Sequence, residues 1–196
     1  MSLWIFIILG MTAALFLIKI VYVLAVVVSV ATTQGALYVS TSRRRIHAVL
    51  ETLPLEGVHV LMDLGCGDGR ILLAARRYFK GRAIGYEINP LAYFKARLFC
   101  AMSDVDIRYQ NFWNEAVDDA DAILCYLFPD VMADLAAKLK AEAKSGALVV
   151  SFNFPIPEFT PVQILRPEGC RINDPVYVYR LAGNGPYEGK QPSFHG

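Results

Sequence analysis

Three glycines alternate with other small or acidic residues directly after an apolar stretch of the sequence. Residues 60–70 read VLMDLGCGDGR, so Gly65, Gly67 and Gly69 follow a run that is typical of a buried strand. Glycines at the end of a strand let the backbone turn sharply and approach a ligand closely. Ligands of open α/β sheets bind beyond the carboxyl ends of the strands. The spacing therefore predicts a ligand-binding loop.

The spacing and charge of this loop argue against a phosphate ligand. A Walker loop needs Lys-Ser or Lys-Thr after the last glycine, and a dinucleotide fingerprint needs G-x-G-x-x-G, whereas this loop reads G-x-G-x-G. Asp63 and Asp68 would repel a pyrophosphate. They suit a cationic ligand with an amino group, a sulfonium and ribose hydroxyls, a description that S-adenosylmethionine fits. A nicotinamide cofactor stays as the alternative.

A further carboxylate supports a ribose-containing ligand. Glu87 ends the next apolar run, eighteen residues beyond Gly69. A carboxylate at the end of the second strand can accept two hydrogen bonds from a ribose diol. Nicotinamide sites use the same device, so Glu87 supports nucleoside binding without choosing between the two cofactors.

The glycine loop belongs to an alternation of strands and helices. Continuous apolar runs separated by helical patterns indicate a mostly parallel sheet that is covered on both faces. The last two apolar runs have no helix between them, so they are expected to pair antiparallel at one sheet edge. Strands are expected at 59–64, 82–88, 106–111, 120–127, 146–154, 161–167 and 175–182, and helices at 42–53, 69–79, 90–102 and 129–144. The predicted fold is α/β, a Rossmann-like seven-stranded mostly parallel sheet with a C-terminal antiparallel hairpin.

One transmembrane helix is predicted before this domain. Residues 3–31 are apolar apart from Lys19, and about 20 such residues cross a bilayer core. A cleaved signal peptide is the alternative, although no positive charge precedes the apolar run. Arg43, Arg44 and Arg45 follow the helix, which places the domain on the cytoplasmic side of an inner or cytoplasmic membrane as a single-pass protein. The predicted units are an anchor at 1–31, a linker and helix at 32–57 that close the cofactor site, a catalytic domain at 58–182 and a flexible tail at 183–196.

The motifs DLGCGDGR and GYEINP resemble those of the class I, seven-β-strand S-adenosylmethionine-dependent methyltransferases. Together with the apolar N-terminal helix, YVSTSRRR and FNFPIPEFTPV, they resemble more narrowly the membrane-anchored protein-lysine methyltransferases of mitochondrial type and their prokaryotic relatives. The resemblance implies that Asp63, Gly65, Gly67, Asp68 and Glu87 bind S-adenosylmethionine. It also implies that Tyr38 and Thr41 help to close the cofactor site, and that Asn111 and Phe112 lie next to adenine.

In class I methyltransferases the loop after the fourth strand contacts the methyl acceptor, so the resemblance implies the same role for this segment. It reads CYLFPD here and lacks the [DN]-P-P-[YF] motif of other amine methylases. Tyr126, Phe128 and Pro129, with Trp113 as a further wall residue, could line an aromatic channel for a lysine, whose stem is apolar and whose head can rest against π faces. Ordinary core packing is the alternative for these aromatic residues.

The predicted function is a membrane-anchored methyltransferase that acts on a lysine of a membrane-associated protein. Methylation of a lipid, quinone or other small amphiphile is the alternative, and a non-catalytic membrane scaffold is the alternative of another class. No metal and no nucleic-acid partner is predicted, because the four cysteines lack CxxC spacing and the net charge is only +1.

Overall fold

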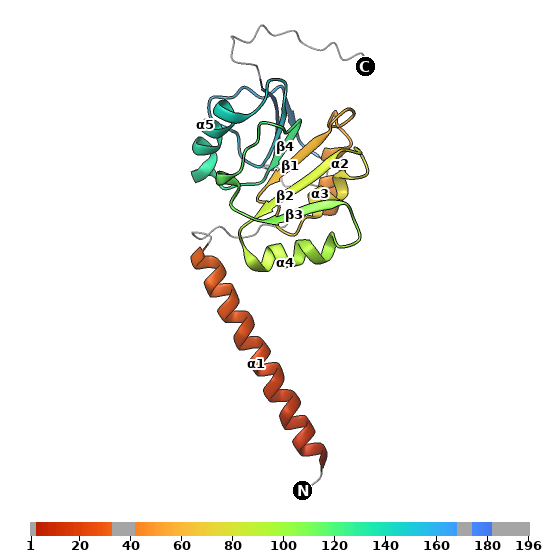
Figure 1. Cartoon of the computed structure of the whole chain (residues 1–196), viewed down its shortest axis with the longest axis vertical. Helices are drawn as coiled ribbons and strands as arrows, with labels where there is room; N and C mark the ends of the chain where they lie inside the picture. The colour runs from red at the N-terminus through yellow and green to blue at the C-terminus, as the bar shows by residue number, and fades with distance from the viewer. Residues whose placement is uncertain (1–2, 33–41, 168–173, 182–196) are drawn as a thin grey trace.

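The computed structural model describes residues 3–32, 42–167 and 174–181 and contains one long helix next to an α/β domain (Figure 1). The long helix is α1, Leu3–Thr32. All side chains from Trp4 to Val21 are exposed, and none of that stretch is buried against the domain. By length and composition α1 can cross a membrane, as the sequence predicts.

The domain is built on a seven-stranded sheet in the order β3-β2-β1-β4-β5-β7-β6. The first five strands pair in parallel, while β7 pairs antiparallel with both β5 and β6. The predicted fold class is therefore confirmed, including the antiparallel pair at one edge. The strands are β1 Val60–Leu64, β2 Arg82–Glu87, β3 Val105–Tyr109, β4 Ala122–Cys125, β5 Leu148–Phe152, β6 Gln163–Leu165 and β7 Val176–Arg180.

Helices cover both faces of this sheet and divide the core into two layers (Figure 1). The helices of the domain are α2 Arg43–Leu50, α3 Arg70–Ala75, α4 Pro90–Phe99 and α5 Met132–Glu142, with short 3-10 turns η1 Phe112–Asn114 and η2 Pro129–Val131. Buried residues of α2, α3 and α4 pack against one face, and those of α5 pack against the other. Side chains alternate between these layers along each strand. In β4, Leu124 belongs to the first layer and Ile123 to the second.

Local sequence signals set several helix boundaries. Ser42 caps α2 by accepting a hydrogen bond from the backbone N–H of Arg45, and Asn89 caps α4 by accepting from Leu91 and Ala92. Pro90 occupies the first turn of α4, a position that needs no N–H donor. The helix predicted at 129–144 is divided into η2 and α5, and α3 ends at Ala75, before the predicted residue 79.

Candidate functional site

The glycine loop connects β1 to α3 at the carboxyl edge of the sheet. It is tied to the next strand because the backbone N–H groups of Gly65 and Cys66 both donate to the carbonyl oxygen of Tyr86, at 3.0 and 2.9 Å. Gly65 has a φ of +81°, and a Cβ there would lie 3.1 Å from Cδ2 of Leu127. Both the backbone conformation and the space therefore call for glycine. The contact also shows that the residues after β4 lie against the loop.

Cys66 fills the space beneath the loop. A Cβ on Gly85 would lie 2.7 Å from the Cys66 sulfur, so the loop packs onto β2 at a point where only glycine fits. The thiol is buried, and burial raises its pKa well above the ordinary value. Cys66 is thus a small packing residue rather than a reactive thiol.

Glu87 lies at the carboxyl end of β2, beside the glycine loop. One carboxylate oxygen accepts a hydrogen bond from the N–H of Gly67 at 2.8 Å, and the other accepts from Asn89 at 2.7 Å. Burial raises the pKa of Glu87, while these backbone hydrogen bonds act in the opposite direction. The N–H of Ile88 acts on the carboxylate in the same direction, and with about four acceptor sites the carboxylate keeps capacity for a further donor. The carboxylate is therefore held in one orientation and can still accept hydrogen bonds from a diol.

Asp63 is a buried carboxyl group whose ionised form is destabilised by its surroundings. Its side chain is 2% exposed, and within the described parts of the chain its Oδ2 has no hydrogen-bond partner. Burial, with Glu87 and Asp68 nearby, raises the pKa of this carboxyl group from 3.8 to about 8. A buried carboxylate without a partner is costly, and a cation beside it would favour the ionised form. Asp63 therefore fits the ammonium or sulfonium of S-adenosylmethionine.

The Asp68 carboxylate interacts with a basic residue nearby in the sequence. It is buried and forms an ion pair with Arg70 at the start of α3. This pair neutralises one of the two carboxylates that the sequence assigned to a cationic ligand. A direct contact between Asp68 and the cofactor stays a prediction.

The predicted adenine-binding residues follow β3. Asn111 is exposed, and its side-chain oxygen accepts from the N–H of Trp113 at 3.1 Å, which caps η1. Phe112 is buried, and its ring lies 4.5 Å from that of Trp113. The Asn111 oxygen can accept a second hydrogen bond. The contact with adenine and the role of Trp113 as a channel wall stay predictions.

The three predicted acceptor residues differ in their surroundings. Tyr126 is half-buried directly after β4, with its ring 6.1 Å from that of Phe152. Phe128 and Pro129 are exposed, and Pro129 begins η2. Of the three, Tyr126 makes the defined polar contact, and the aromatic channel as a whole stays a prediction.

A polar relay holds Tyr126 in place, and the sequence did not predict it. Arg45 donates from Nη2 to Oδ1 of Asn153 at 2.6 Å, and Nδ2 of Asn153 donates to the Tyr126 hydroxyl at 2.8 Å. Arg45 carries donors only, so it fixes which end of the Asn153 amide faces the tyrosine. Asn153 has a φ of +70°, a conformation that asparagine tolerates better than most residues.

Arg45 therefore differs from the other two arginines of its triplet. It is 6% exposed, stacks over the Phe152 ring at 5.6 Å and donates to the backbone oxygen of Asp174 at 2.9 Å, whereas Arg43 and Arg44 are exposed. Of the three arginines that the sequence analysis used together to orient the membrane helix, Arg45 is thus a buried residue of the domain. Its position four residues before the buried Val49, on the apolar face of α2, is the signal that could have identified it.

Two predicted cofactor-closing residues, Tyr38 and Thr41, lie outside the described residues. Nothing in the structure tests their role.

Comparison with known proteins identifies the family. Residues 63–163 match the family model of the ANTKMT methyltransferase domain. The adenine nucleotide translocase lysine N-methyltransferase of Mus musculus is 38% identical over 154 residues, 76% of this chain and 65% of that protein. A protein-lysine N-methyltransferase of Saccharolobus islandicus is 31% identical over 147 residues, 72% of this chain and 91% of that protein. The chain thus spans slightly less than two thirds of the mouse relative's length.

A solved structure with the same fold has a bound cofactor product. The RNA methyltransferase of Salinibacter ruber in complex with S-adenosyl-L-homocysteine is 29% identical, with a TM-score of 0.68 over 76% of this chain and 98% of that one. The predicted cofactor agrees with this complex. The matched family segment contains the glycine loop, Glu87, Tyr126 and Asn153. The chain therefore belongs to the ANTKMT methyltransferase domain family, and with it to the class I S-adenosylmethionine-dependent methyltransferases.

Proposed function

We propose that this protein transfers a methyl group from S-adenosylmethionine to a lysine side chain of a membrane-associated protein. The observation that carries the proposal is the contact between the two halves of the site. Leu127, next to Tyr126, lies against the Gly65 backbone, so the acceptor segment adjoins the cofactor loop. The choice of lysine is supported by the relatives from Mus musculus and Saccharolobus islandicus, both named as lysine N-methyltransferases.

The cofactor side of the site orients a cationic nucleoside. When bound, S-adenosylmethionine supplies a methyl group on a sulfonium, which is an activated donor. Glu87 would accept from the ribose hydroxyls, and the buried Asp63 would lie beside the amino-acid end, whose ammonium group stabilises its ionised form. The backbone of the glycine loop permits close approach because no side chain intervenes at Gly65 and Gly67.

The acceptor side of the site favours a neutral amine in a fixed position. Tyr126 accepts one hydrogen bond from Asn153, and its second lone pair can accept an N–H of the lysine amine. The positive charge of Arg45 lies behind Asn153 and disfavours a second cation, so it would lower the pKa of a bound lysine ammonium. Alignment of a neutral amine with the methyl group then supplies much of the rate enhancement, without a dedicated general base.

Membrane association of the enzyme is part of the proposal. α1 is long and apolar enough to span a bilayer, and tethering would raise the effective concentration of a membrane-bound acceptor. We place the domain on the cytoplasmic side of an inner membrane, because the basic residues Arg43 and Arg44 follow α1 closely. Resistance to carbonate extraction and protease protection of intact membrane vesicles test these two statements.

The acceptor class is tested by incubating membranes containing the full chain with cofactor that carries a tritiated methyl group. Label is expected in the protein fraction, and digestion should release it as methylated lysine. A Tyr126→Phe variant should lower the rate while S-adenosylhomocysteine still binds. Label found only in lipid or only in RNA would overturn the lysine assignment, and no transfer to any fraction would support a non-catalytic scaffold.

A further inference from the structure

Helix α4 has its small residues directed inward and its large apolar residues directed outward. Ala92, Ala96 and Cys100 are buried against the sheet. The outward residues, which we call the α4 surface, are Phe94, Leu98 and Phe99 of α4 and Met102 in the turn that follows it, with exposed fractions of 62, 61, 55 and 100%. The outward face of a helix on a water-soluble domain is normally polar. This reversal indicates that the α4 surface is covered by something other than water.

The area of the α4 surface is large for an exposed patch. A fully exposed side chain of this size has an accessible surface of ~200 Å². With the exposed fractions given above, the four residues together expose roughly 500 Å² of apolar surface. Contiguous apolar patches of more than a few hundred Å² mark interaction sites for proteins or membranes.

The charges around the α4 surface favour an anionic partner. Residues 90–102 contain two basic residues, Lys95 and Arg97, which are both exposed, and no acidic residue. Asp104, just beyond Met102, is exposed but forms an ion pair with Arg76. Long basic side chains at the edge of an apolar face can reach phosphate groups while their stems stay in apolar surroundings. An apolar face edged with basic residues is the pattern of a helix that lies in the interface of a bilayer.

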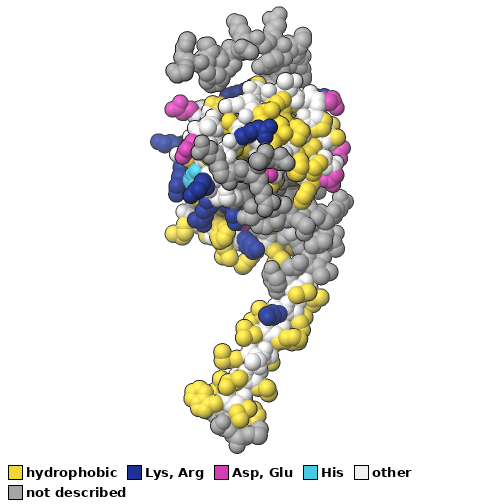
Figure 2. Space-filling model, turned by 180° about the vertical axis from the view of Figure 1, so that it is seen from behind, with side chains coloured by type: hydrophobic (Ala, Val, Ile, Leu, Met, Phe, Trp, Pro, Cys, Tyr) yellow, Lys and Arg dark blue, Asp and Glu magenta, His cyan; other side chains and the backbone are white. Residues whose placement is uncertain are grey.

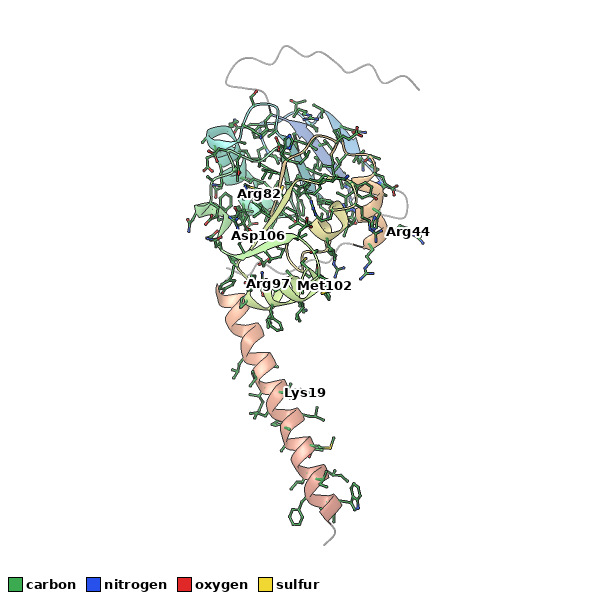
Figure 3. All side chains as sticks on the ribbon, turned by 45° about the vertical axis from the view of Figure 1, so that its right-hand side comes forward. Lys19, Arg44, Arg82, Arg97, Met102 and Asp106 are labelled. Carbon is green, nitrogen blue, oxygen red and sulfur yellow. The ribbon has the colours of Figure 1, made fainter. Side chains whose placement is uncertain are left out.

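Helix α4 lies beside α1, so the membrane that α1 enters is the one that the α4 surface can reach. α1 contacts α4, and α4 lies across the end of the domain from which α1 departs, level with its last turns (Figure 1). Apolar and basic side chains gather at this end of the domain (Figure 2), and Arg97 and Met102 lie on it, with Arg44 in the same half of the domain (Figure 3). Thirty helical residues extend ~45 Å, which exceeds a ~30 Å hydrocarbon core and leaves the last turns of α1 at the headgroups.

We propose that the α4 surface docks onto the same bilayer that α1 enters, with Phe94, Leu98, Phe99 and Met102 at the headgroup boundary. The inference rests on the membrane anchoring proposed above. Docking at a second point beside α1 would fix the orientation of the domain. Asn89 at the start of α4 follows Glu87 closely, so the cofactor edge of the sheet would be held at a constant height above the membrane.

The test uses the full chain reconstituted into vesicles of phosphatidylcholine, with and without phosphatidylserine. An environment-sensitive fluorophore is placed at Met102→Cys in a Cys170→Ser background, where the thiols of Cys66, Cys100 and Cys125 are buried. The matched control carries the label at Ala141→Cys, an exposed position on α5. Spin-labelled lipids and aqueous iodide serve as quenchers from the two sides of the interface.

Docking predicts that lipid quenching at position 102 is several-fold stronger than at position 141, and that iodide quenching is several-fold weaker. Phosphatidylserine should increase the difference. The double variant Phe94→Glu, Leu98→Glu changes two residues that are already exposed, so it should still bind S-adenosylhomocysteine while the lipid quenching at position 102 is lost. If that variant fails to bind, the comparison of positions 102 and 141 decides alone.

Equal iodide quenching at positions 102 and 141, in vesicles that retain the protein after carbonate washing, would overturn docking while leaving the anchor intact. Shielding of position 102 that is the same in detergent as in vesicles would also overturn it, because a second copy or another part of the chain would then cover the surface. Release by carbonate would overturn both anchor and docking. Lysine methylation is judged separately, by the partition of the tritium label.

Discussion

Binding of S-adenosylhomocysteine should tighten about 50-fold between pH 6 and pH 8, because a ligand with an ammonium group favours the ionised form of Asp63. The pKa of this carboxyl group in the free protein is about 8. Its ionised fraction is then about 1% at pH 6 and about one half at pH 8, and the affinity of a ligand that requires ionisation follows that fraction. Binding in this range should release a proton.

Isothermal titration calorimetry in buffers of different ionisation enthalpy measures both quantities. The matched control is Asp63→Asn, which is neutral at every pH and of nearly the same size. Its profile should lack the 50-fold rise and show only the titration of the ligand's amino group, which weakens binding toward high pH. A wild-type profile that parallels the profile of the Asp63→Asn variant, or a binding step without proton release, would refute the assignment of Asp63 to the cation.

Four further outcomes follow from the geometry. The thermal stability of Asp63→Asn without ligand should exceed that of the wild type by a margin that grows from pH 5 to pH 8. The pKa of the Asp63 carboxyl is about 8 in the folded protein and 3.8 for the ordinary group. Its contribution to the stability of the folded wild type is therefore complete below pH 3.8 and is lost as the pH rises through 8. The loss between pH 5 and pH 8 is at most about 4 kcal/mol. Gly65→Ala should cost about 1 kcal/mol of folding free energy from its φ of +81° and weaken S-adenosylhomocysteine binding, as chemical denaturation and calorimetry would show. Arg45→Met should lower kcat while KM changes little. It should also move the acidic limb of the pH–rate profile to a pH higher by roughly one unit, because the loss of a positive charge near the amine raises the pKa of the bound lysine. An acidic limb at the wild-type pH would contradict this role of Arg45. Asn153→Ala should reproduce the fall in kcat with a smaller shift of the limb, because it releases Tyr126 while the charge of Arg45 remains.

Much of the fold was predictable because it depends on local patterns. β1, β4 and β5 are largely continuous apolar runs, whereas β3 alternates buried and exposed residues. Helix α4 begins at Asn89 and Pro90, residues that cap or tolerate a helix start. The antiparallel edge followed from the absence of a helix between residues 167 and 175. The sequence did not predict that β7 lies between β5 and β6 in the sheet. The last two strands, β6 and β7, are both short and apolar, so the sequence alone does not show which of them pairs with β5.

The cofactor half of the site was predictable for the same reason. The glycine loop and Glu87 depend on spacing within one βαβ unit, and the structure joins them through the hydrogen bond from Gly67. The pairing of Asp68 with Arg70 was missed, although the two residues are close together in the motif, because a carboxylate in such a loop can serve either a ligand or a neighbouring arginine.

The acceptor half depends on contacts that are distant in sequence. Arg45 and Asn153 are 108 residues apart, and a hydrogen bond between such positions leaves no periodic signal. Three successive arginines also look alike in a sequence, and only the position of Arg45 on the apolar face of α2 separates it from Arg43 and Arg44. The positive φ of Asn153 was likewise invisible, since asparagine occurs in turns of many kinds.

Mass spectrometry of membrane proteins shows whether this protein methylates lysine residues. Membranes that lack this protein are incubated with S-adenosylmethionine and either the purified full chain or its Tyr126→Phe variant. Specific lysine residues are expected to gain one or more methyl groups with the wild type and to gain them more slowly with the variant. Methyl transfer to lipid without any methylated lysine, or lysine methylation that proceeds equally well without the protein, would contradict this expectation.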